Sequence, residues 1–263
     1  MNPGGEGAGG GDGRRALGLD PGGTGSARAW TLDLAHGRVV AVPVVEAGEL
    51  VAPPMARWAT ERAIEPAVAA AIAELHADER AGLAQLPPAR RGEWIAGRRA
   101  LRAALHDVGG ADMARIALAA DDRGAPVVPA GLVGSISHKR VLAVAVAAAD
   151  DGWRIGIDLE QVGPRRVDVA PRIMVPAERV AIAELSGAAR DLAVIRAFAL
   201  KEAVYKAIDP FLRRHVGFLE VEVWPDDDGG ARVVGAPAWG LAIEATWCRH
   251  GDHLICTARA RRI

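Results

Sequence analysis

Two carboxylates two positions apart, Asp158 and Glu160, have the clearest potential for chemistry in the sequence. They lie in Ile-Gly-Ile-Asp-Leu-Glu, residues 155–160, where apolar residues alternate as in a β-strand. On such a strand both carboxylates project from one face, with only Gly156 beside them. Like charges this close repel each other unless a cation lies between them, and hard oxygen ligands suit Mg²⁺. The segment predicts either a strand with one solvated face or part of a magnesium site.

A third carboxylate, Glu202, lies on a helix that the sequence predicts over residues 191–208. Lys201 precedes it, and Lys206 follows at the four-residue spacing of an ordinary intrahelical salt bridge. That pairing is the structural alternative to a functional role for both residues. Strands are expected through the remainder, residues 217–263.

Arginines gather on an earlier predicted helix, residues 89–105. Arg98 and Arg102 are four positions apart and therefore share a side of this helix. The arginines of this segment are Arg90, Arg91, Arg98, Arg99 and Arg102. They make a cationic patch suited to bidentate phosphate contacts, unless they are only a solvated helix face.

Between these helices the pattern changes to turns and strands. Residues 121–126 form a predicted turn that contains Arg123, and residues 141–147 predict a central strand that is apolar on both faces. Ser137 and His138 precede that strand, a position between two core elements that favours a functional role as much as a packing role.

Composition sets the outer limits on the class of protein. The chain has 263 residues, 50% of them hydrophobic, which suits one large domain or two modest ones. Its formal net charge of -1 argues against nucleic-acid binding through bulk charge. The longest apolar run, residues 141–149, is too short to cross a bilayer, so we expect a soluble protein with no membrane partner.

The only two cysteines, Cys248 and Cys256, are too few for a disulfide framework, and a reducing cytoplasm is the expected compartment. With His250 and His253 they supply the four ligand types of a zinc site. The spacings differ from those of common closed zinc sites, so a hairpin turning at residues 251–252 is the favoured interpretation.

The beginning of the chain offers one weak motif. Residues 1–13 are rich in glycine and predict a disordered tail, with no apolar stretch for a signal peptide. Residues 17–33 then open Leu-Gly-Leu-Asp-Pro-Gly-Gly-Thr-Gly-Ser, which resembles the first phosphate loop of sugar kinases with the actin-like ATPase fold. Those kinases need a second phosphate loop and a catalytic Asp downstream, and the sequence offers neither. A turn after an N-terminal strand is favoured over a kinase loop built on Asp20.

Taken together and in order, these motifs resemble the 4′-phosphopantetheinyl transferases, in particular the enterobactin-synthase and surfactin-type branch. The similar segments are Gly134-Ser135-Ile136-Ser137-His138, Gly156-Ile157-Asp158-Leu159-Glu160 and Phe198-Ala199-Leu200-Lys201-Glu202-Ala203-Val204-Tyr205-Lys206-Ala207. Residues 90–98 and the later 210–211 and 217–218 add to the similarity. The resemblance covers about residues 85 to 225.

The resemblance implies an α/β fold of two pseudo-symmetric lobes, residues 14–150 and 151–263, with coenzyme A held between them. A faint internal repeat agrees, because setting Trp94 against Phe198 also aligns Arg102 with Lys206. The implied reaction moves the phosphopantetheine arm of coenzyme A onto a serine of an acyl or peptidyl carrier protein and releases adenosine 3′,5′-bisphosphate.

The resemblance also implies roles for individual residues. Asp158, Glu160 and Glu202 would hold Mg²⁺, for which Mn²⁺ could substitute, and Glu202 or a metal-bound water would take the serine proton. Lys201 and Lys206 would neutralise phosphate charge as the bond breaks. The expected coenzyme A contacts are Arg90, Arg98, Arg123, Ser137, His138, Lys201 and Lys206.

The sequence leaves several points open. An ATP-dependent sugar kinase and a non-catalytic relative that only binds carrier domains are the alternative functions, and a metal-dependent nuclease is more distant. The carrier and its pathway are not specified, and a monomer is sufficient because one chain supplies both lobes. Candidate contacts to an acidic carrier are Arg165, Arg166, Arg172, Arg213 and Arg214.

Overall fold

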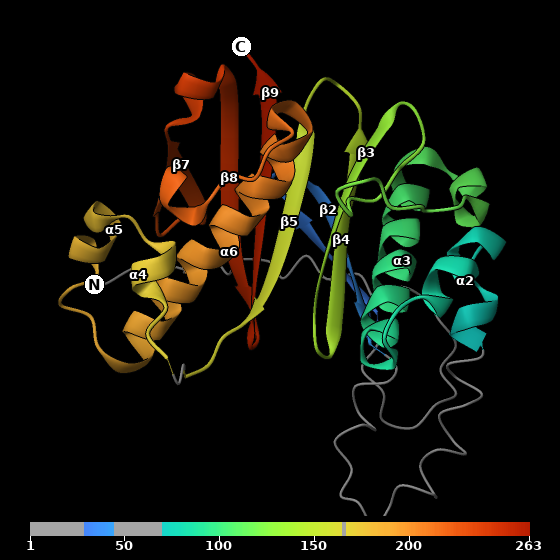
Figure 1. The fold of residues 1–263 in the computed structure, drawn as a ribbon, viewed down its shortest axis with the longest axis horizontal. Helices are drawn as coiled ribbons and strands as arrows, with labels where there is room; N and C mark the ends of the chain where they lie inside the picture. The colour runs from blue at the N-terminus through green and yellow to red at the C-terminus, as the bar shows by residue number, and fades with distance from the viewer. Residues whose placement is uncertain (1–28, 45–69, 165–166) are drawn as a thin grey trace, which may run out of the picture.

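The structure, a computed structural model, describes residues 29–44, 70–164 and 167–263. Two antiparallel sheets stand side by side, and a long helix covers one face of each (Figure 1). This confirms the expected α/β architecture. The motif around Asp20 and the candidate contacts Arg165 and Arg166 lie outside the described residues.

The first sheet has the strand order β1-β2-β4-β3, and the second has the order β5-β9-β8-β7-β6. The strands of the first are β1 (Trp30–Leu34), β2 (Gly37–Pro43), β3 (Leu132–Lys139) and β4 (Leu142–Ala149). Those of the second are β5 (Arg154–Gln161), β6 (Glu222–Pro225), β7 (Gly230–Val234), β8 (Leu241–His250) and β9 (His253–Arg262). The chain passes from one sheet to the other through the short turn between β4 and β5.

The two longest helices cover the segments predicted as helices, residues 89–105 and 191–208, and both extend beyond these ranges. They are α3 (Pro88–Gly109) and α6 (Gly187–Leu212). The shorter helices are α2 (Ala77–Ala84), α4 (Ala170–Ile173) and α5 (Pro176–Ala181), with 3₁₀ turns η2 (Ala111–Arg115), η3 (Phe218–Glu220) and η4 (Ala236–Trp239). Among the described residues, no helix combines the length and the apolar character needed to cross a bilayer.

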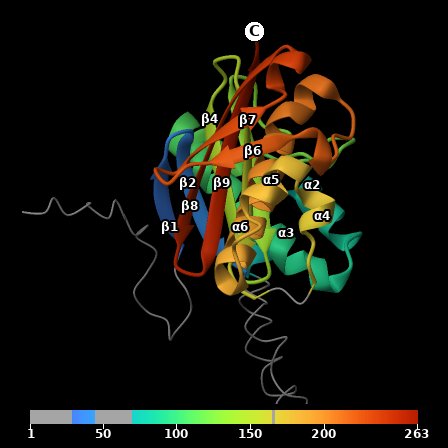
Figure 2. The same ribbon diagram turned by 90° about the vertical axis from the view of Figure 1, so that its left-hand side faces the viewer.

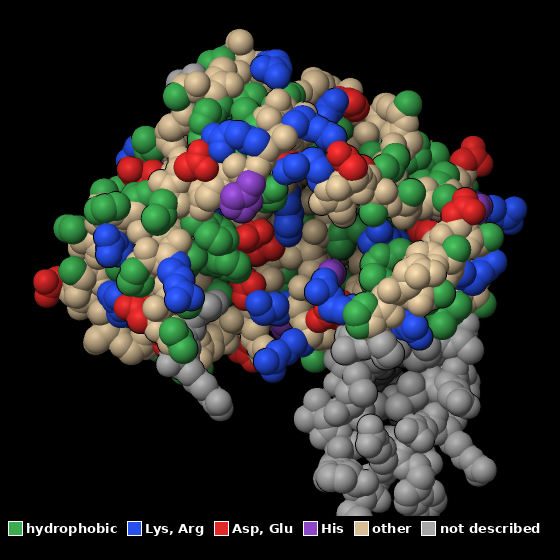
Figure 3. Space-filling model, viewed as in Figure 1, with side chains coloured by type: hydrophobic (Ala, Val, Ile, Leu, Met, Phe, Trp, Pro, Cys, Tyr) green, Lys and Arg blue, Asp and Glu red, His purple; other side chains and the backbone are tan. Residues whose placement is uncertain are grey.

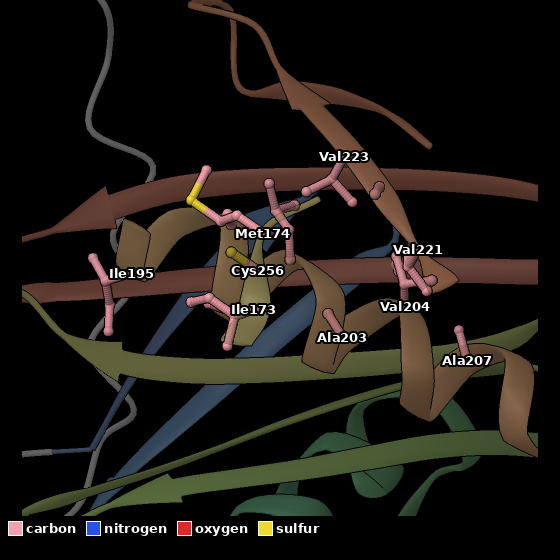
Figure 4. Close-up of a cluster of buried hydrophobic side chains, with 14 of the residues drawn as sticks. Ile173, Met174, Ile195, Ala203, Val204, Ala207, Val221, Val223 and Cys256 are labelled. Atoms are coloured by element: carbon pink, nitrogen blue, oxygen red, sulfur yellow. The ribbon is translucent and has the colours of Figure 1, made fainter. Parts of the chain in front are cut away.

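Each long helix forms an apolar core with its own sheet, and each sheet together with its helix makes one lobe. In the second lobe, Ala203, Val204 and Ala207 of α6 pack toward Cys256 of β9 and the residues around Val223 (Figure 4). In the first lobe, α3 buries its apolar side against alternate residues of β2 and β4. Burying a side chain of valine or leucine size contributes about 1.5–3 kcal/mol, so these two layers fix the helices on their sheets.

A third core joins the two sheets on the side away from the helices. Ile155, Ile157 and Leu159 of β5 pack there with Val39 and Val144 of the first sheet. Figure 2 shows β1 and β2 beside β8 and β9, where the rings of Trp30 and His250 lie 4.2 Å apart. Because residues alternate along β5, this apolar packing turns Asp158 and Glu160 to the helix side. Both are only 5% exposed, which excludes a solvated strand face.

The C-terminal strands form the hairpin that the sequence favours over a zinc site. Strands β8 and β9 pair as a hairpin in which His250 faces His253, and Gly251 in the turn has a φ of 57°. Cys248 pairs with Ile255 rather than with Cys256, and no group of His, Cys, Asp and Glu side chains within the described ranges is arranged to hold an ion. The favoured hairpin interpretation is confirmed.

Strand β5 and helix α6 approach each other closely at Gly156. A Cβ atom placed on this glycine would lie 2.0 Å from the carbonyl oxygen of Ala203 and 2.8 Å from the amide nitrogen of Ala207. Both atoms belong to the backbone of α6, which cannot move aside without shifting the whole helix. Only glycine therefore lets α6 lie this close to β5.

We expect Gly156→Ala to lower the free energy of unfolding by about 1–3 kcal/mol, the usual cost of overpacking a core, because the methyl group displaces α6. Urea denaturation followed by circular dichroism measures this change. Gly163→Ala is the matched control, since its Cβ would meet open space, and its effect should stay within about 0.5 kcal/mol. Equal stability of the two variants would contradict the tight contact.

Candidate active site

The edges of the two sheets meet at β3 and β5, where serine hydroxyl groups join them. Ser135 Oγ accepts a hydrogen bond from the Ile157 amide at 3.1 Å, and Ser137 Oγ accepts one from the Leu159 amide, also at 3.1 Å. Ser137 Oγ donates in turn to Asp158 Oδ1 at 2.9 Å. Ser137, predicted as a nucleotide contact, thus has a clear second task, which is to orient a carboxylate at the junction of the lobes.

A cleft of about 730 Å³ opens on the helix side of this junction. It is lined by β3, by the turn at residues 121–126 and by one side of α6. In Figure 3 Lys and Arg side chains gather with Asp and Glu side chains around the hollow in the middle of this face. Of the predicted site residues, the cleft lining contains Arg98, Arg123, Ser137, His138, Glu202 and Lys206.

Asp158 and Glu160 each bind a lysine. Lys206 Nζ donates to Asp158 Oδ1 at 2.8 Å and to the Ile157 carbonyl at 2.8 Å. Lys139 Nζ donates to Glu160 Oε1 at 2.7 Å. Asp158 Oδ2 is buried and has no hydrogen-bond partner among the described residues. A buried carboxylate oxygen without a donor is costly, so this atom is suited to a cation or a bound donor.

Glu202 faces the same group of charges. Burial raises the pKa of Glu202, and the negative charges of Asp158 and Glu160 raise it further, while Lys206 opposes them. The influence of Asp158 and Glu160 on the pKa of Glu202 indicates that the three carboxylates lie in one region, although within the described residues they are not arranged as a ready-made ion site. An oxygen-only set of donors is the type that a hard divalent cation prefers.

The cationic end of the cleft contains Arg98. Its guanidinium stacks over the Trp94 ring at 4.1 Å, and its Nε is buried without a hydrogen-bond partner among the described residues. Burial lowers the pKa of Arg98 to about 10, so the group remains charged at neutral pH. A buried guanidinium with an unpaired N–H is suited to an anionic ligand.

His138 and Arg90 lie beside the same carboxylate, Glu93. His138 Nδ1 is 3.2 Å from Glu93 Oε2, but the two atoms are not aligned as a hydrogen bond. Burial lowers the pKa of His138, and the positive charges of Arg90, Lys206 and Arg98 oppose the pull of Glu93. Arg90 is more loosely placed, with Nε 3.9 Å from Glu93 Oε2 and a side chain that is 66% exposed.

Arg123 bridges the lobes. Its Nε and Nη2 donate to both carboxylate oxygens of Asp209 at 2.6–2.9 Å, and Nη2 also donates to the Tyr205 hydroxyl at 3.1 Å. These bonds raise the pKa of Arg123. The predicted phosphate contact would therefore require this side chain to leave Asp209. The sequence hints at one feature of this contact. Asp209 follows Tyr205 by one helical turn, so both partners of Arg123 lie on the same side of α6.

Lys201 does not face the cleft, and its predicted role in neutralising phosphate charge does not fit its position. Its side chain is 1% exposed, and Nζ donates to Glu178 Oε2 at 2.7 Å and to the carbonyls of Ile173 at 2.7 Å and Phe218 at 3.0 Å. Adjacent helix residues point about 100° apart. Since Glu202 faces the cleft, Lys201 turns toward the core instead.

The partner of Lys201 is part of an arrangement that occurs in both lobes. Glu178 also accepts the amides of Val175 and Val223. In the first lobe, Glu79 accepts the amides of His76 and Leu118 and pairs with Arg102 of α3. The two glutamates are 99 positions apart, at 79 and 178, and so are their cations, at 102 and 201. The sequence places Arg102 among the arginines suited to phosphate contacts. In the structure it is instead the partner of the buried Glu79.

Comparisons with known proteins agree with this geometry. Residues 78–148 match the 4′-phosphopantetheinyl transferase N-terminal domain, and residues 154–258 match the 4′-phosphopantetheinyl transferase superfamily. The 4′-phosphopantetheinyl transferase Svp of Streptomyces mobaraensis is 35% identical over 77% of this chain and 85% of its own length. The chain therefore belongs to the 4′-phosphopantetheinyl transferase superfamily, in the branch that includes Svp and enterobactin synthase component D.

Other relatives match more locally. Enterobactin synthase component D of Salmonella typhimurium is 39% identical over 45% of this chain, which spans about half, 48%, of that relative's length. The 4′-phosphopantetheinyl transferase PptT of Mycobacterium tuberculosis is 33% identical over 60% of this chain and 72% of its own length. Among solved structures, a holo-(acyl-carrier-protein) synthase of Bacillus anthracis has a TM-score of 0.36 and 24% identity, covering 41% of this chain and 96% of that one.

We expect Lys201→Met to lower the free energy of unfolding by about 3–5 kcal/mol, because it leaves the buried Glu178 without its cation. Urea denaturation measures the loss. The double variant Lys201→Met with Glu178→Gln should recover part of it, because no buried charge is then left unpaired. If Lys201→Met instead kept full stability and raised the KM for a ligand of the cleft, Lys201 would belong to the binding site after all.

Proposed function

We propose that this protein transfers the 4′-phosphopantetheine arm of coenzyme A to a serine hydroxyl of an apo acyl or peptidyl carrier protein, releasing adenosine 3′,5′-bisphosphate. The observation that supports the proposal is the proximity of Asp158 and Glu160 to Glu202 and Lys206, two residues that line the cleft together with Arg98. Acidic groups for a metal beside cations for phosphate are what attack on a pyrophosphate requires.

Mg²⁺ fits the acidic part of this site, and Mn²⁺ is a chemically similar substitute. Asp158, Glu160 and Glu202 would hold the ion, since all offer carboxylate oxygens and Asp158 Oδ2 has no donor among the described residues. When bound, the ion offsets the charge of the pyrophosphate. A cation among the three carboxylates would also offset the repulsion from Asp158 and Glu160 that helps to raise the pKa of Glu202.

The chain's own residues then have distinct tasks. Glu202 accepts the proton of the carrier serine, directly or through a water beside it. The serine oxygen forms a bond to the phosphorus that bears the pantetheine arm, and the bond from that phosphorus to the departing nucleotide phosphate breaks. Lys206, already beside Asp158, offsets the charge that develops on the leaving oxygen.

The 3′-phosphate of the nucleotide would lie at the cationic end of the cleft. Arg98 is the strongest candidate to bind it, because its Nε lacks a partner among the described residues. Arg90 and His138 adjoin it, and Arg123 would contribute only by releasing Asp209. The lobes that enclose this cleft correspond in the proposal to residues 14–150 and 151–263.

For the carrier, the proposal keeps Arg172, Arg213 and Arg214 as candidate contacts, and of these Arg213 lines the cleft. Arg213 and Arg214 have side chains that are 53% and 46% exposed, and they pair with Asp122 and Glu220. The proposal includes a cytoplasmic monomer that binds neither nucleic acid nor membrane. The kinase alternative gains no support from family membership, and a non-catalytic role is disfavoured because all three acids are retained.

Incubating the protein with coenzyme A, Mg²⁺ and an apo peptidyl carrier domain should add one phosphopantetheine to the carrier, as measured by mass spectrometry of the intact domain. Asp158→Asn should reduce the transfer rate at least about 100-fold, because it removes a charge from the proposed metal site. Circular dichroism checks that the variant remains folded. A carrier of unchanged mass with the wild-type protein, across acyl and peptidyl carriers, would refute the transferase proposal.

We expect Arg98→Leu to raise the KM for coenzyme A about 10- to 100-fold, since a charge-assisted hydrogen bond is worth about 1.5–3 kcal/mol. The neighbouring Arg99 is the matched control, because its Nε binds Glu74 Oε2 at 2.9 Å on another side of α3. Arg99→Leu should change the KM less than about twofold. Steady-state kinetics with varied coenzyme A measures both, and equal effects would count against a specific role for Arg98.

A further inference from the structure

Lys139 is a site residue to which the sequence motifs assign no role. It follows Ser137 and His138 at the end of β3, and its Nζ binds Glu160 Oε1 at 2.7 Å across the junction between the lobes. The Glu160 side chain is 7% exposed, whereas that of Lys139 is 40% exposed. A flexible lysine thus reaches from the solvent edge to a buried carboxylate that belongs to the proposed metal site.

Lys206, the other lysine at this site, is held more firmly. It binds the Ile157 carbonyl as well as Asp158, and its side chain is 27% exposed. Among the described residues, Lys139 Nζ makes its hydrogen bond to Glu160 alone. An exposed ammonium on a four-carbon stem regains hydration when it withdraws, so Lys139 is the cation that leaves at the lower cost.

The charges of the site support an exchange. Asp158, Glu160 and Glu202 carry three negative charges when ionised, and Lys139 and Lys206 supply two positive charges. A divalent cation added to all five groups would leave one positive charge in excess in a confined space. If Lys139 withdraws as the ion enters, the charges of the three carboxylates, Lys206 and the ion sum to zero.

We propose that Lys139 is an internal counter-ion that occupies Glu160 in the metal-free protein and that a divalent cation must displace to bind. The inference rests on the proposed metal site but requires neither coenzyme A nor a carrier. Because binding must compete with an existing ion pair, the apparent affinity for the ion equals the intrinsic affinity multiplied by the fraction of molecules in which the pair is open.

The test measures Mn²⁺ binding to the full-length protein without coenzyme A, from the electron paramagnetic resonance signal of free Mn²⁺. Lys139→Gln should lower the Kd about 3- to 10-fold, because the competing ammonium is gone. Arg140→Gln, an exposed neighbour, removes the same charge without the contact and should leave the Kd within about twofold. The double variant Lys139→Gln with Glu160→Gln should not show the gain in Mn²⁺ affinity, because the carboxylate that Lys139 binds is then absent.

Thermal unfolding supplies a second readout. Lys139→Gln should unfold at a lower temperature than wild type without metal, and added Mn²⁺ should raise its Tm by more than it raises that of wild type. An unchanged or weaker Kd in Lys139→Gln would overturn the proposal, as would an equal gain in Arg140→Gln or an absence of Mn²⁺ binding in every variant. Transfer of phosphopantetheine is measured separately, so the proposed function can stand while this inference fails.

Discussion

The close contact of α6 with β5 is the constraint on which the rest of the site depends. Gly156 lets the helix backbone at Ala203 and Ala207 approach the strand without an intervening side chain. Lys206 can then bond directly to the Ile157 carbonyl and Asp158, and Glu202, one helical turn before it, faces the same carboxylates. Strand β5 and helix α6, which are separated along the chain, are thereby held close enough for their side chains to act on one ligand.

The site concentrates negative charge in a place that the apolar packing makes almost inaccessible to water. Buried carboxylates are tolerated only when cations and hydrogen-bond donors surround them. Here Ser137, Lys206 and Lys139 perform that task for Asp158 and Glu160. Ser137 and Lys139 also join β3 to β5, so the junction of the lobes and the electrostatic balance of the site share contacts. A change of ligand in the cleft would therefore alter the contacts at the lobe junction.

Away from the cleft, both lobes fasten their long helix in the same way. A buried glutamate, Glu79 or Glu178, accepts two backbone amides and one cation from the helix. Each glutamate thus joins the start of a short helix, a later segment and the long helix, and both of its oxygens accept hydrogen bonds. This shared arrangement indicates two related halves more directly than the faint alignment of Trp94 with Phe198, and it does so in a register of 99 residues.

The sequence by itself determined which residues carry charge on which strand and helix face. Alternation around Asp158 and the four-residue spacing of Glu202 and Lys206 are local properties, and local periodicity assigns faces reliably. Only the tertiary structure decided what each face meets. It turned Lys201 into the core, paired Arg123 with Asp209 and set Lys139 against Glu160. These partners are 21 to 86 positions apart along the chain, and no local pattern specifies which distant group a side chain will reach.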